Sequence, residues 1–94
     1  MREIMKVFDV HPIPNRGVVI GGTNPLLDHW SRQTIQAWIG KEVEIHTAKT
    51  ILPTKVIDVT VASSLTGHKN IFILLPQEVK LGDIQEPAVV YGVH

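Results

Sequence analysis

The chain has 94 residues, which is enough for one small domain with a single core. Its nine Lys and Arg residues balance nine Asp and Glu residues, so no net positive charge attracts nucleic acid, and we expect no DNA binding. Cysteine is absent and the longest aliphatic and aromatic run extends only from Ile71 to Leu75, which excludes a disulfide framework and a membrane-spanning helix. We therefore expect a cytoplasmic protein without a membrane partner.

Short runs rich in β-branched residues predict β-strands separated by Gly, Pro, Asn and Thr. These strands are expected near 3–10, 16–22, 42–47, 55–62, 70–75 and 88–92. Residues 42–47 alternate apolar and polar side chains, which is typical of a strand with one buried face and one exposed face. Residues 71–75 are apolar throughout, which predicts a central strand covered on both faces and ended by Pro76.

One segment carries helical signals instead. Asn24 can cap the free amides of a first turn, and Pro25 suits the first helical position because its missing N–H is not needed there. A spacing of three or four residues would give one packing stripe, formed by Leu27, Trp30, Thr34 and Trp38. We therefore predict a short helix over 25–37, inserted into a mainly β chain.

Short strands with short connections around one helix favour a small closed β-barrel over a sandwich, because closing the sheet removes exposed edges. No repeat, charge block or low-complexity tract divides the sequence. We predict a single β-barrel domain over 1–94.

Several turn and strand motifs follow one another in a fixed order. Val7, Val10 and Ile13 precede the corner Asn15-Arg16-Gly17, which leads into Val18-Val19-Ile20 and the pair Gly21-Gly22. The later motifs are Gly40-Lys41-Glu42-Val43-Glu44-Ile45, Thr54-Lys55-Val56, the run 67–75, and Asp83-Ile84 ahead of Pro87-Ala88-Val89-Val90. Over about residues 5–92, this order resembles the second, β-barrel domain of the translational GTPases, the family typified by elongation factor Tu.

The resemblance implies a binding barrel, since in that family this domain contacts the aminoacylated end of transfer RNA or the ribosome. Arg16 and Gly17 match the family's Gly-Arg-Gly corner. Where the family usually has a short charged hairpin, this chain has the Trp-containing segment before Gly40. The sequence holds no Gly-x-x-x-x-Gly-Lys-Ser/Thr loop, so we expect no nucleotide hydrolysis and no cofactor.

Enzyme chemistry has one candidate set of residues. Ser63, Ser64 and His68 fall in one predicted loop and could supply the nucleophile and base of a small hydrolase, although the same residues suit an ordinary hairpin turn. The five histidines lack the spacing typical of zinc ligands. We expect a protein that is not an enzyme and holds no metal.

Two features could instead support binding. Trp30 and Trp38 either anchor the core at one end of the barrel or face a partner, because tryptophan is enriched at interface hot spots. Basic residues fall mostly at strand ends and corners, where they could meet phosphates. They are Arg16, Lys41, Lys49, Lys55, Lys69 and Lys80.

These observations predict a non-catalytic binding or interaction module. Interleaved acidic residues weaken the positive field, and the strands show no evident aromatic platform for stacking bases. Another protein or a second copy of the chain is therefore favoured as the partner, ahead of RNA or the ribosome as an accessory domain of translation. The candidate interaction residues are Arg16, Gly17, Trp30, Trp38 and Lys69.

Overall fold

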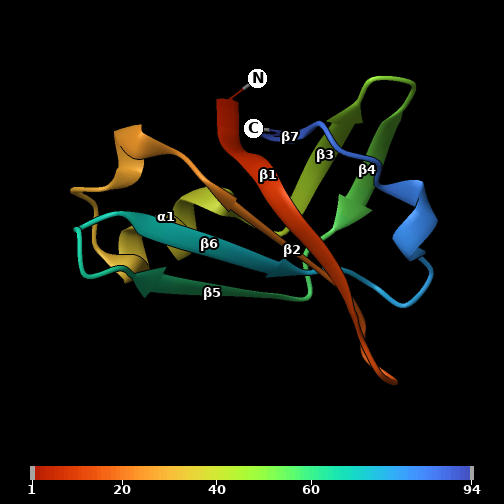
Figure 1. Cartoon of the computed structure of the whole chain (residues 1–94), viewed down its shortest axis with the longest axis horizontal. Helices are drawn as coiled ribbons and strands as arrows, with labels where there is room; N and C mark the ends of the chain where they lie inside the picture. The colour runs from red at the N-terminus through yellow and green to blue at the C-terminus, as the bar shows by residue number, and fades with distance from the viewer. Residues whose placement is uncertain (1, 94) are drawn as a thin grey trace.

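Strands dominate residues 2–93, the part of the chain that the computed structural model describes (Figure 1). They are β1 (Arg2–Ile13), β2 (Gly17–Thr23), β3 (Glu42–Thr47), β4 (Ile51–Lys55), β5 (Asp58–Ser63), β6 (Lys69–Leu74) and β7 (Ala88–Gly92). All seven join one sheet in the order β4-β3-β7-β1-β2-β6-β5, with every neighbouring pair antiparallel. The prediction of a mainly β fold is confirmed.

The sheet is open, so the predicted closed barrel is wrong. β4 and β5 are its edge strands, and no ladder joins them within residues 2–93. The chain nevertheless passes from one edge to the other through Val56 and Ile57 alone, so the sheet must be strongly curved. The Val56 N–H donates to the Lys41 carbonyl (2.8 Å) and the Ile57 N–H donates to the Leu74 carbonyl (2.9 Å), which fixes this link to both sides.

Helix α1 (Arg32–Ile39) covers part of β5, an edge strand that would have been paired in a closed barrel. From this helix, Gln36 Nε2 donates to the Val59 carbonyl oxygen at 3.0 Å. This bond occupies an acceptor on an edge strand that would otherwise be free to pair with another chain. The Gln36 side chain thus protects one exposed edge of the sheet from pairing with another chain, a protection that we expected from closure into a barrel.

Three sequence predictions of elements need correction. The strand expected over 55–62 begins only at Asp58, as β5, and the separate strand β4, which ends at Lys55, was not predicted. The strand expected to be central, β6, lies next to the edge, and β1 occupies the middle of the sheet. β1 also continues to Ile13, beyond the predicted end at residue 10. In this second half β1 pairs with β2 alone, because β7 pairs only with the first half. Pro12 is tolerated there because its missing N–H costs no ladder bond on the unpaired side.

The predicted helix over 25–37 is interrupted. Asn24 caps a single 3-10 turn, η1 (Pro25–Leu27), by accepting the Leu26 N–H at 3.1 Å, as the sequence predicted. A second cap then starts α1, where Ser31 Oγ accepts the Thr34 N–H at 3.1 Å. Because α1 begins at this later cap, its buried face carries Ile35 and Ile39, and Thr34 of the predicted stripe is exposed.

The core lies inside the curve of the sheet and repeats every second residue along the strands. Val43 and Ile45 are both buried, which confirms the alternation predicted for residues 42–47. Helix α1 contributes Ile35 and Ile39, and the turn η2 (Leu81–Asp83) precedes the buried Ile84. The other face of the sheet points outward and carries the surface described next.

Candidate interaction surface

The hairpin of β1 and β2 projects from the rest of the fold (Figure 1), and the exposed Arg16 lies in its turn. Asn15 (φ 64°) and Gly17 (φ 121°) adopt left-handed conformations, which few other residues tolerate. The Arg16 N–H donates to the Ile13 carbonyl at 3.0 Å, and a Cβ on Gly17 would lie 2.5 Å from the Leu75 carbonyl oxygen. The backbone of this corner is therefore fixed, while the Arg16 side chain is exposed.

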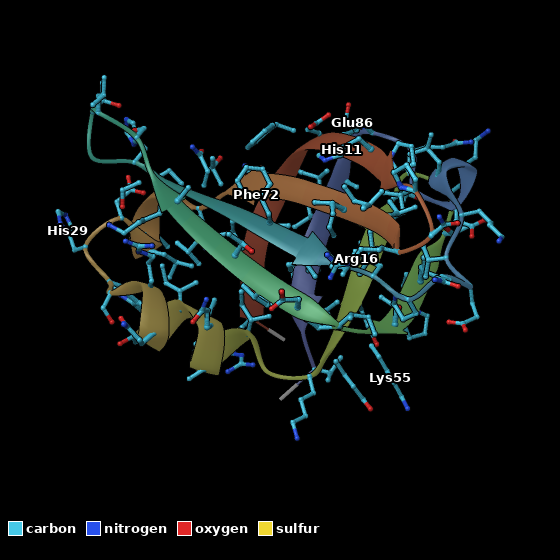
Figure 2. The ribbon with its side chains drawn as sticks, turned by 90° about the horizontal axis from the view of Figure 1, so that it is seen from below. His11, Arg16, His29, Lys55, Phe72 and Glu86 are labelled. Carbon is cyan, nitrogen blue, oxygen red and sulfur yellow. The ribbon has the colours of Figure 1, made fainter. Side chains whose placement is uncertain are left out.

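Two phenylalanines meet on the outward face of the sheet. Phe8 on β1 and Phe72 on β6 pack edge to face, with ring centroids 6.4 Å apart and an interplanar angle of 86°. Phe8 is 51% exposed and Phe72 is half-buried. In Figure 2 the Phe72 ring lies on the side of β6 away from helix α1. Aromatic side chains this accessible are typical of contact surfaces.

A glycine makes room for the two rings. Gly21 on β2 lies directly opposite Phe72, and a Cβ at this position would be 2.9 Å from Phe72 Cε1 and 3.5 Å from Phe8 Cζ. At this position β2 has no side chain between the two rings, which lets the rings approach each other across the strand. Gly21 and Gly22 both lie within β2.

A shallow hollow of about 160 Å³ connects the Phe72 ring to Arg16. Ile13 and Val19 form its apolar floor, and Asp58 and Thr60 line its β5 side. Arg16 lies beside the carboxyl end of β6 in Figure 2, with Phe72 farther back on the same strand. We call Phe8, Ile13, Val19 and Phe72 the outer aromatic face. Arg16 lies at one end of it.

The tryptophans lie on the other side of the fold, with helix α1. Trp30 and Trp38 pack edge to face, with centroids 5.2 Å apart and an interplanar angle of 78°, and both are half-buried against the core. Arg2 Cζ lies 5.0 Å from the centre of the Trp38 ring, a cation–π contact. These contacts favour the core interpretation of both rings over the interface interpretation.

Lys69 is engaged within the chain. Its Nζ donates to the Asp28 carbonyl oxygen (3.0 Å), and its backbone N–H donates to Asp28 Oδ1 (3.0 Å). Asp28 Oδ2 lies 2.9 Å from His68 Nδ1, so one aspartate fastens the β5–β6 hairpin to the segment before α1. The structure therefore separates Lys69, Trp30 and Trp38 from Arg16 and Gly17.

Of the candidate hydrolase residues, Ser63 ends β5, and Ser64 and His68 lie in the β5–β6 turn. Ser64 Oγ accepts the His68 backbone N–H at 3.1 Å and lies 3.0 Å from Thr66 Oγ1, as expected of an ordinary hairpin turn. The His68 ring bonds to Asp28, and no hydrogen bond links this ring to Ser63 or Ser64 within residues 2–93. This arrangement does not build the nucleophile–base contact that the hydrolase alternative needs.

The hydrogen bonds to Asp28 predict acid sensitivity of the fold. The Lys69 backbone N–H, and then His68, hold the pKa of the Asp28 carboxyl below its ordinary value. Because this pKa is lower in the folded chain than in the unfolded chain, ionised Asp28 stabilises the fold above the unfolded pKa. That stabilisation is lost as the pH falls through the folded pKa.

We therefore expect Asp28→Asn to lower the melting temperature near neutral pH, and the deficit relative to wild type to shrink below about pH 4. Thermal unfolding followed by circular dichroism from neutral pH to about pH 2 measures both effects. Glu78→Gln removes one charge from an exposed residue and serves as the control. Identical profiles for wild type and Asp28→Asn would contradict the prediction.

Other kinds of site are not found in the described residues. Residues 2–93 contain no group of three or more His, Cys, Asp or Glu side chains placed to hold a metal ion. No helix in that range is both long and apolar enough to cross a membrane. Comparison of the chain with protein-family models, curated proteins and solved structures finds no match.

Proposed function

We propose that this chain is a non-catalytic module that binds another protein through the outer aromatic face. The observation that carries the proposal is the Phe8–Phe72 pair, because an aromatic ring that is 51% exposed packs edge to face on a second, half-buried ring and leaves apolar surface in water. Protein interfaces typically combine such aromatic residues with a polar rim. Asp58, Thr60 and Arg16 provide a rim of this kind.

The charges around the face favour a protein over RNA. Asp58 lines the hollow beside Phe72, and Asp9 on β1 pairs with His11, with Asp9 Oδ2 3.0 Å from His11 Nδ1. Carboxylates at these positions repel phosphates, while the formal net charge of the chain is zero. Lys69 does not line the hollow, and its Nζ donates to the Asp28 carbonyl oxygen in the segment before α1. A partner with apolar and mixed polar groups fits this surface better than a polyanion.

Affinity capture from native lysate tests the proposal when wild type is compared with Phe8→Ser. We expect wild type to retain specific proteins that Phe8→Ser loses, since the substitution removes the exposed ring and leaves the core intact. Leu65→Ser is the matched control, because Leu65 is fully exposed in the β5–β6 turn and lies outside the outer aromatic face. This control should retain the same proteins as wild type.

Two arms separate the alternatives. Ribonuclease treatment should leave the captured proteins unchanged, and loss of all of them would replace the proposal with RNA binding. Light scattering of the purified chain should show a monomer, and a dimer that Phe8→Ser dissociates would make a second copy the partner. Equal capture by wild type and Phe8→Ser would overturn the role of the outer aromatic face.

A further inference from the structure

A second hollow lies on the other side of Arg16, with a volume of about 300 Å³. One wall is the β1–β2 corner and the other is the segment that leads from β6 to η2. Its lining residues are Pro12, Asn15, Arg16, Gly17, Val18, Gln77, Val79, Lys80 and Leu81. Because Arg16 lines both hollows, this one continues the surface that begins at Phe72.

The hollow has a one-sided charge. Arg16 and Lys80 both line it, and no carboxylate does. Glu78 stands between Gln77 and Val79 in the sequence, but it is exposed and does not line the hollow. The next acid along the chain, Asp83, accepts the Lys80 backbone N–H on its Oδ2 at 2.9 Å. Within residues 2–93, Arg16 forms no ion pair, and Lys80 Nζ has only a long contact of 3.4 Å to the Gln77 carbonyl. Both cations are therefore available to an anion from outside.

The walls are held together before any ligand arrives. Gln77 Nε2 donates to the Asn15 carbonyl oxygen at 2.6 Å, which joins the two walls. Val79 is buried, and its N–H donates to the Pro76 carbonyl at 3.0 Å. Positive φ at Asn15 and Gly17 fixes the backbone on either side of Arg16. A site with a fixed backbone loses less entropy on binding than a flexible loop would.

We propose that this hollow binds a carboxylate of an acidic segment of the partner protein. Apolar residues of the same partner would lie next to it, on the outer aromatic face. Only the placement of the partner's apolar residues on the outer aromatic face rests on the proposed function. Arg16 presents the planar fork that pairs with both oxygens of a carboxylate, and Lys80 adds a point charge. A pair of cations matches one or two carboxylates, whereas a nucleic acid strand would bring further phosphates toward Asp58.

The hollow can be tested without knowing the partner. The probe is an acetylated and amidated tetraglutamate peptide, titrated into the full ¹⁵N-labelled chain while amide resonances are followed by NMR. We expect saturable shifts of residues 15–18 and 77–81, and none with tetralysine. Arg16→Gln should weaken the binding about tenfold, because it removes a charge-assisted, two-pronged hydrogen bond. Arg32→Gln, an exposed arginine on α1, is the matched control and should bind as wild type does.

Each outcome decides the proposal. Absence of shifts at these residues, or equal shifts in Arg16→Gln, would overturn the carboxylate site. Tighter binding of oligouridylate than of tetraglutamate to the same residues would assign the hollow to phosphates and overturn it as well. Shifts that persist in Phe8→Ser would support the hollow even if the capture experiment fails, so the two proposals fail separately.

Discussion

Gly22→Ala should lower the free energy of unfolding by about 3 kcal/mol, the upper range for an overfilled core. A Cβ at Gly22 would lie 2.5 Å from the Lys6 carbonyl oxygen and 2.8 Å from Met5 Cγ and Sδ. The nearest atom belongs to the backbone of β1, so no side-chain rotation relieves the overlap. β2 is held by β1 on one side and β6 on the other, so shifting it strains two ladders.

Urea unfolding and thermal unfolding both measure this loss, which corresponds to a decrease in melting temperature of more than about 10 °C for a domain of this size. Gly21→Ala should cost less, because the Phe72 ring that it meets can turn away. Gly82→Ala should leave stability nearly unchanged, since its Cβ would meet nothing within 4 Å. Equal stability of the Gly22 and Gly82 variants would show that β2 can move freely.

The sequence contained enough information for the local structure that depends on neighbouring residues. Positive φ at Asn15 and Gly17, the Asn24 cap and the alternation of Val43 and Ile45 each follow from short-range sterics or periodicity. The corner that presents Arg16 could therefore be predicted. The helix boundary was missed because Ser31 offered a second cap that competes with continuation from η1.

Closure of the sheet and the outer aromatic face could not be predicted in the same way, because both depend on which strands become neighbours. A bulge in β1 between Val7 and Asp9 interrupts the alternation beside Phe8. Phe72 lies within an apolar run that has no visible periodicity. The pairing of β2 with both β1 and β6 brings the two rings together across Gly21. In the sequence, the only feature that pointed to this face was Gly21, a glycine in a strand that lies between the two strands carrying Phe8 and Phe72.

The anion hollow combines both kinds of information. Arg16 was a candidate from its corner motif, while Lys80 was one basic residue among several in the sequence. Their convergence depends on the path of the chain between β6 and η2, which the Gln77 side chain ties to Asn15. Residue types alone did not separate Lys80 from Lys69, whose ammonium is bound internally.

Trp38→Ala should lower the free energy of unfolding by about 2–3 kcal/mol, less than for a fully buried tryptophan because the ring is half-exposed. The substitution removes packing against the core, the edge-to-face contact with Trp30 and the cation–π contact with Arg2. A decrease in melting temperature of about 10 °C or more is the expected result. Trp38→Phe should recover part of it, since a smaller ring keeps some of these contacts.

A double-mutant cycle with Trp30→Ala isolates the contact between the two rings. The coupling should be about 1 kcal/mol, the usual value for an edge-to-face aromatic pair beyond the area that each ring buries. Substituting either tryptophan should leave capture of partner proteins unchanged in the temperature range where the variant is folded. Loss of capture by a variant with an unchanged melting temperature would move the contact surface from the outer aromatic face to helix α1, and it would restore the interface interpretation of both tryptophans.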